Sequence, residues 1–200
     1  MLCQVRCLRA AARSDRALLL ITDGGKGIAK AIADTFGALA LHQRCRLHKR
    51  RNVMGHLPEG LRPLVGQKLD AAWAKEDPEG AERALRSLAS SLEENHPGAA
   101  ASLREGLEET LTISRLSLSL ALVKVFKSTN PIGSLNDGIC VVQQNVKRWR
   151  GGKMAERWTA AAVLLREKRF RRINGYRDLW HLERALDRHT KEVTSSRTAA

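Results

Sequence analysis

The order of hydrophobic and polar residues changes along the chain, from short apolar runs to a helical repeat. Residues 17–22 (ALLLIT) form a continuous apolar run, which is typical of a strand buried on both faces. Residues 27–36 place apolar side chains at helical spacing, and residues 38–43 (ALALHQ) predict a second short strand. Because a helix separates the two strands, this part of the chain predicts an α/β unit.

Helical periodicity dominates the rest of the chain, so the fold class is predicted to be α/β but predominantly helical. The pattern predicts helices at residues 4–13, 46–56, 60–75, 77–92 and 97–111. Ser128, Thr129 and Asn130 favour a helix start before Pro131. We therefore expect two further helices, at residues 131–149 and 153–168. The final residues, TSSRTAA, are expected to be disordered.

Positive charge is the strongest signal in the composition. With 35 Lys and Arg against 21 Asp and Glu, the formal net charge is +14 and the isoelectric point is about 10.4. This excess implies a polyanionic partner, most simply nucleic acid, although a generally basic surface would give the same charge. No apolar stretch approaches the ~20 residues of a membrane helix, and four scattered cysteines fit a reducing compartment. We expect a cytoplasmic protein with no membrane partner.

The charge is concentrated in residues 145–173, which contain ten Lys and Arg against two Glu. Concentrated cations with interleaved aromatic residues are typical of binding to the phosphate backbone of DNA. The side chains expected to bind DNA here are Lys147, Arg148, Arg150, Lys153, Arg157, Arg169, Arg171 and Arg172. Trp149 and Trp158 are expected to have a structural role, packed in the core.

The stretch TDGGKG, residues 22–27, suggests either a phosphate-binding loop or a metal ligand. It lacks both the spacing and the Ser or Thr of a phosphate-binding loop, so that interpretation is weak. Asp23 follows a predicted buried strand, where a carboxylate can bind Mg²⁺ with partners from other strands. The simpler alternative is that Asp23 only starts a turn.

The stretch QRCRLHKRRN, residues 43–52, contains a second candidate site. Cys45 and His48 have C-x-x-H spacing, but zinc needs two more ligands, and such a pair more often packs or hydrogen-bonds within the fold. The neighbouring cations would either bind an anionic partner such as DNA or form a solvated face; they are Arg44, Arg46, Lys49, Arg50 and Arg51.

Four stretches, in order, resemble the mutator-type transposases of bacterial insertion sequences. They are TDGGKGIAKAI, QRCRLHKRRNV, STNPI and NVKRWRGGKMAERWTAAAVLLREKRFRRINGY, and the resemblance extends from about residue 8 to about residue 188. It implies an RNase H-like catalytic domain with a helical insertion before the last acid. It also implies binding, cleavage and transfer of DNA at insertion-element ends, with three acids holding two Mg²⁺ or Mn²⁺ ions.

On this resemblance Asp23 is the second catalytic acid and a metal ligand, and Gly133 occupies the position of the last acid. The family reads S-T-N-P-I-E-S where this chain reads STNPIGS. The family's first acid lies well upstream, and Asp15, in a polar turn, is the sole acid before Asp23. Asp137, one helical turn after Gly133, is a poor substitute because its side chain is shorter and starts elsewhere. We therefore expect a truncated and catalytically inactive copy.

The resemblance also divides the chain into parts. Residues 1–43 are expected to form part of the RNase H-like sheet, and residues 44–127 an all-helical insertion. Residues 128–190 are expected to be basic helices that complete the catalytic domain, with Asn130 in a structural role, and residues 191–200 a disordered tail. Cys45 and His48 match a C-x-x-H pair of the family whose role stays open.

Two further hypotheses fit the same residues. The chain could be a non-catalytic DNA-binding protein that self-associates or interferes with an intact transposase by mixed assembly. It could also be a small zinc-binding module that uses Cys45 and His48, with Cys3 and Cys7. Both the transposase hypothesis and the hypothesis of a non-catalytic DNA-binding protein would place the protein at the bacterial nucleoid.

Overall fold

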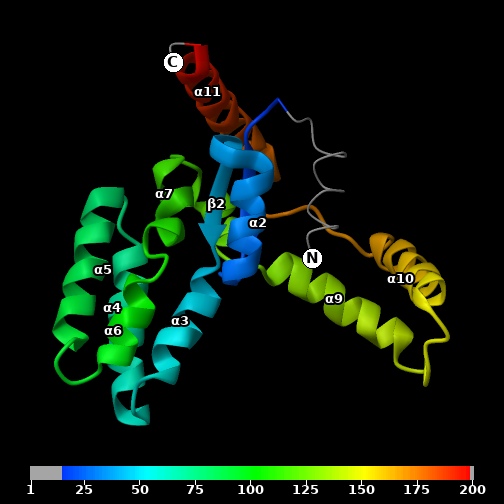
Figure 1. The fold of residues 1–200 in the computed structure, drawn as a ribbon, viewed down its shortest axis with the longest axis horizontal. Coiled ribbons are helices and arrows are strands. Elements are labelled where there is room, and N and C mark those ends of the chain that lie inside the picture. The colour runs from blue at the N-terminus through cyan, green and yellow to red at the C-terminus, as the bar shows by residue number, and fades with distance from the viewer. Residues whose placement is uncertain (1–14, 199–200) are drawn as a thin grey trace.

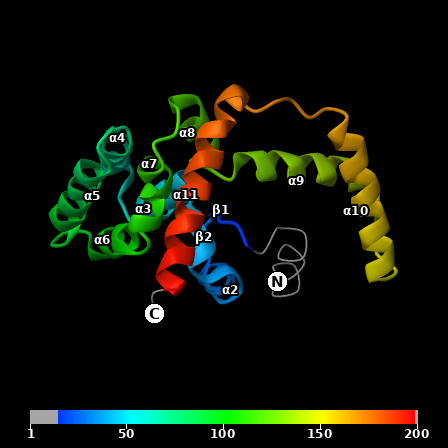
Figure 2. The same ribbon diagram turned by 90° about the horizontal axis from the view of Figure 1, so that it is seen from above.

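The computed structural model describes residues 15–198, a mostly helical chain with one two-stranded parallel sheet (Figures 1 and 2). The expected mostly helical α/β character is confirmed. The helix expected at residues 4–13 lies outside the described residues, as do Cys3 and Cys7. Within the described part, no helix combines the length and apolarity needed to span a lipid bilayer.

The sheet comes from a strand–helix–strand unit near the start of the described chain. Its elements are strand β1 (Leu18–Thr22), helix α2 (Lys26–Phe36), the 3-10 turn η1 (Gly37–Leu39) and strand β2 (Ala40–Arg44). The two strands pair in parallel, with Thr22 opposite Arg44. Because the strands run in the same direction, the residues that follow them, Asp23 and Cys45, lie at the same edge of the sheet.

A bundle of helices follows β2 and contains the main hydrophobic core. Its elements are α3 (Arg46–Gly55), η2 (Glu59–Leu61), α4 (Arg62–Trp73), α5 (Pro78–Leu92), α6 (Pro97–Arg104) and η3 (Glu108–Leu111). Leu69 and Leu85 are fully buried in this core. Asp77 fixes the start of α5 because its carboxylate accepts bonds from the N–H groups of Glu79 and Gly80. Figure 1 shows the bundle to one side of the sheet.

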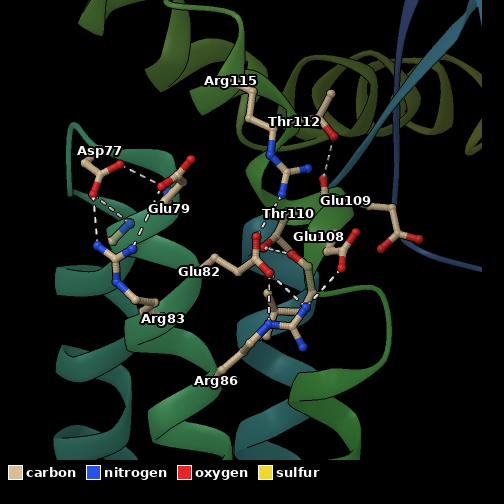
Figure 3. Close-up of polar contacts among 12 residues, drawn as sticks. Asp77, Glu79, Glu82, Arg83, Arg86, Glu108, Glu109, Thr110, Thr112 and Arg115 are labelled. Carbon is tan, nitrogen blue, oxygen red and sulfur yellow. Dashed lines mark hydrogen bonds and ion pairs between the residues drawn. The ribbon is translucent and has the colours of Figure 1, made fainter.

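Ion pairs join the outer face of α5 to η3 and to the short helix α7 (Thr112–Arg115) (Figure 3). Glu82 accepts bonds from Arg86 at 2.9 Å and from Arg115 at 3.0 Å. Arg86 also donates to Glu108 at 3.0 Å. Exposed pairs of this kind contribute little stability each, so their main effect is to fix Arg115 against α5.

The chain then returns to the sheet and forms a hairpin of two helices. Helix α8 (Leu120–Phe126) precedes α9 (Asn130–Gln143) and α10 (Gly152–Glu167). We call residues 130–167 the α9–α10 hairpin. It extends away from the sheet on the side opposite the bundle (Figures 1 and 2). The helix expected to reach residue 149 ends at Gln143.

The last helix, α11 (Leu179–Thr198), follows the turn η4 (Tyr176–Asp178) and packs on the strand–helix–strand unit. Asp187 pairs with Arg16 at 2.5 Å, and the Thr190 hydroxyl accepts a bond from the N–H of Ala17 at 2.9 Å. Helix α11 continues to Thr198 and so includes most of the residues expected to form a disordered tail from residue 191.

Candidate functional site

The turn after β1 presents Asp23 at the edge of the sheet. The N–H of Cys45 donates to the carbonyl of Thr22 at 2.7 Å, which joins the two strand ends. The exposed Asp23 carboxylate accepts a bond from the backbone N–H two residues later at 3.2 Å. Gly24 has a φ of +94°, and a Cβ there would collide with the Arg44 side chain. The turn thus requires glycine and directs a carboxylate to solvent.

Cys45, His48 and Thr129 form a hydrogen-bonded cluster beside this edge. The Cys45 sulfur accepts bonds from the N–H of Thr129 at 3.4 Å and from its hydroxyl at 3.6 Å, and His48 Nδ1 lies 3.2 Å from it. Burial raises the pKa of the Cys45 thiol. The hydrogen bonds from His48 and Thr129 together lower this pKa by more than burial raises it, so the net shift is downward. The C-x-x-H pair therefore joins the end of β2 to the start of α9.

Gly133 lies one helical turn beyond this cluster. Its N–H donates to the carbonyl of Thr129 at 3.0 Å, within the first turn of α9, the helix that Asn130 begins. A Cβ at Gly133 would meet no atom within 4 Å. The contacts from Thr22 to Cys45, and from Cys45 to Thr129, bring the start of α9 to the edge that carries Asp23. A Cβ at position 133 therefore fits without displacing a neighbour.

The acids and metal ligands that the structure brings together are too few for a metal centre. Among residues 15–198, no group of three or more His, Cys, Asp or Glu side chains is placed to hold a metal ion. The residues described here therefore do not fit a two-metal centre on their own. The zinc hypothesis, which also needs Cys3 and Cys7, stays a prediction because these two lie outside the described residues.

Three of the five cations of residues 44–51, namely Arg44, Arg46 and Lys49, lie inside the protein. Arg44 is 6% exposed and donates to the Glu105 carbonyl at 3.0 Å, and Lys49 is fully buried, with its ammonium bonded to the carbonyls of Ser102 and Glu105. This burial argues against the expected DNA contacts of both, because their charges are used to hold α6 against the sheet and α3. Arg50 is half-buried beside Asp70, and Arg51 is exposed.

Residues 145–173, the basic segment, lie mostly on the surface of the α9–α10 hairpin and of the residues after it. Of its ten cations nine are exposed: Lys147, Arg148, Arg150, Lys153, Arg157, Lys168, Arg169, Arg171 and Arg172. Trp149 and Trp158 are 41% and 42% exposed, which contradicts the expectation that they pack in the core. Both indoles line an open hollow of about 790 Å³ together with Arg148 and Arg150, and no other element of residues 15–198 lines it.

Thr129 is the site residue that the sequence did not reveal. It stands in the STNPI stretch, where its expected role was that of a helix cap, and it lies 84 residues from Cys45 in sequence. A hydrogen bond from a threonine to a distant cysteine leaves no periodic pattern in the sequence. Only the motif order, which places both residues near predicted catalytic positions, indicated that they could meet.

A family model and two known proteins that are similar in sequence to this chain all indicate transposases. A model of the family described as "Transposase, Mutator family" matches residues 12–167. A transposase for insertion sequence element IS6120 from Mycolicibacterium smegmatis is 28% identical over 117 residues, which are 58% of this chain and 35% of that protein. A transposase for insertion sequence element IST2 from Acidithiobacillus ferrooxidans is 25% identical over 166 residues, 74% of this chain and 56% of that protein. The chain thus spans about a third and about half of the lengths of these two relatives.

Proposed function

Because this chain belongs to the Mutator family of transposases, as its motifs indicated, we propose that it acts in transposition by binding DNA through the α9–α10 hairpin. The observation that carries the proposal is the set of nine exposed cations on and after this hairpin, which extends away from the rest of the molecule. Cations on an open surface can neutralise phosphates along a duplex, and the two half-exposed tryptophans can pack on sugars or bases. The bacterial nucleoid is the location that follows from this proposal.

Direct binding to duplex DNA tests the proposal. The full chain should bind a 30-base-pair duplex at 50 mM salt, and the affinity should fall steeply with salt, by a factor of about 10³ or more between 50 and 200 mM if six or more phosphates are contacted. Fluorescence anisotropy measures both quantities. A chain that is folded by circular dichroism but does not bind at 50 mM salt would contradict the proposal.

The family relation also supports an RNase H-like domain, of which the described sheet would be a part. Parallel strands joined by a helix, followed by a helical bundle and then by α9, match the order of that fold with an insertion before its last acid. In this arrangement Asp23 is the second acid, and position 133 is where the third would stand. The carboxyl edge of the strands is where sites form in open α/β sheets.

We propose that the chain does not cleave DNA on its own. The family uses Mg²⁺ or Mn²⁺, but a single carboxylate at Asp23 cannot define the shells of two such ions, and Gly133 supplies no ligand. The chain can therefore supply DNA binding and a part of the catalytic scaffold.

One observation favours a second role, interference with an intact transposase. The α9–α10 hairpin leaves several large apolar side chains open to solvent: Ile132, Val141, Trp149, Trp158, Leu164 and Leu165. Exposed apolar surface of this kind marks protein contacts. A chain that retains this hairpin but lacks an acid would form mixed assemblies with reduced activity.

A further inference from the structure

A second cationic surface lies in a cleft between the bundle and helices α7 and α8, and of its lining residues only Asn130 belongs to the α9–α10 hairpin. The cleft has a volume of about 1000 Å³ and is lined by parts of α3, α4, α7 and α8, and by Asn130 at the start of α9. It therefore extends from the helical bundle to the edge of the sheet that carries the candidate site. No residue of this cleft belongs to the segment 145–173.

Arg46 places a positive charge at the floor of the cleft without a counter-charge. Its side chain is 5% exposed, and its guanidinium donates to the carbonyls of Thr110 at 2.9 Å and Trp73 at 3.2 Å and to the Ser114 hydroxyl at 2.7 Å. All three acceptors are neutral. Burial lowers the Arg46 pKa to about 10, so the group stays charged at neutral pH. A buried cation whose charge is not balanced attracts an anion to the space above it.

The rim of the cleft adds free cations and few acids. Lys75, Lys124 and Lys127 are exposed there, and none of them pairs with a carboxylate in the described part of the chain. Asp70 already lies 3.5 Å from Arg50. Arg115 is directed to Glu82 (Figure 3), which leaves Glu76 as the other acid of the lining. The cleft thus has a clear excess of positive charge.

We infer that this cleft binds the sugar–phosphate backbone of DNA, as a second contact separate from the α9–α10 hairpin. The inference rests on the proposed DNA-binding function and extends it to the bundle. DNA suits the cleft better than an acidic peptide does, because one end of the cleft lies at the start of α9. A strand held near Asp23 would continue directly into it. Phosphates above Arg46 would also offset the cost of burying that charge.

The test compares three variants of the full chain. Lys124→Gln/Lys127→Gln alters the cleft, and Lys68→Gln/Lys191→Gln removes two exposed lysines elsewhere as the matched control. The third variant combines the cleft changes with Arg148→Gln/Arg150→Gln in the hairpin. If both cleft lysines contact phosphates, the slope of log Kobs against log salt falls by about 1.8 and affinity at 0.1 M salt falls about 10- to 100-fold. The loss should add to that of the hairpin changes, and the control should match the wild type.

The outcomes separate the inference from the function on which it rests. If the wild type binds DNA and the cleft variant binds as tightly as the control, the cleft does not bind DNA, and the proposed DNA-binding function is unaffected. No DNA binding by a folded wild type at 50 mM salt would overturn both. If polyglutamate binds the wild type and loses affinity for the cleft variant while DNA binding is unchanged, the cleft takes an acidic peptide and the DNA assignment is wrong.

Discussion

Replacing Arg148, Arg150, Lys153 and Arg157 together with glutamine should weaken duplex DNA binding by about three orders of magnitude at 0.1 M salt. All four side chains are exposed on the α9–α10 hairpin. Each lost phosphate contact on B-DNA lowers the salt slope by about 0.9, so four contacts account for about 3.6. Anisotropy titrations at several salt concentrations measure the slope and the affinity together.

A fourfold control separates this effect from a general loss of charge. Lys30, Lys68, Arg188 and Lys191 are exposed on other helices, and changing them to glutamine removes the same net charge. This control should keep nearly all of the wild-type slope of log Kobs against log salt. Equal losses in the two variants would mean that DNA is attracted by net charge and does not dock on the hairpin.

The free energy of unfolding should rise between about pH 8 and pH 10.5 because of Lys49, and the rise should be absent from Lys49→Met. Burial, with a further contribution from Arg44, lowers the Lys49 pKa from 10.5 to about 8. In this window the unfolded chain binds more protons than the folded chain, so stability increases with pH. Below pH 8 both states are protonated and the folded state bears the full cost of the buried charge. A shift of this size corresponds to at most about 3 kcal/mol.

Urea unfolding at pH 7 and at pH 10 measures this difference. Lys68→Met, at an exposed position on α4, serves as the control and should follow the wild-type pH dependence. Other titrating groups contribute equally in all three proteins. The difference in unfolding free energy between the wild type and Lys49→Met therefore isolates the contribution of Lys49. Parallel curves for the wild type and Lys49→Met would show that the ammonium is not buried as described.

Local patterns predicted several elements, because a strand or a helical repeat depends on neighbouring residues, but the helix expected at 97–111 ends at Arg104 and α8 was not predicted. The apolar run at residues 17–22 became β1, and the helical repeat at 77–92 became α5. Lys49 shows where such patterns fail. Arg46, Lys49 and Val53 share one buried face of α3, although two of them are cations that suggested a surface. The carbonyls that receive Lys49 come from Ser102 and Glu105, more than 50 residues later, and no local pattern encodes them.

The same limit explains the tryptophans and the candidate site. Trp149 and Trp158 were expected in the core because they are large and apolar, but no element among residues 15–198 packs over them in the hairpin, so both stay exposed. Motif order predicted that Asp23 and position 133 belong to one site. It did not predict that Cys45 and Thr129 connect them, since that contact depends on the path of the whole bundle between the two residues.

We propose that Asp23 and position 133 share one site from which a carboxylate is missing. Mn²⁺ titration followed by electron paramagnetic resonance tests it on the wild type, Gly133→Glu and the uncharged, similarly shaped control Gly133→Gln. Neither substitution meets an obstacle at its Cβ. Gly133→Glu should bind Mn²⁺ at least tenfold more tightly than the wild type and Gly133→Gln, and adding Asp23→Asn should remove the gain. If Gly133→Glu binds no better than Gly133→Gln, or if the gain survives Asp23→Asn, the two positions do not form one site.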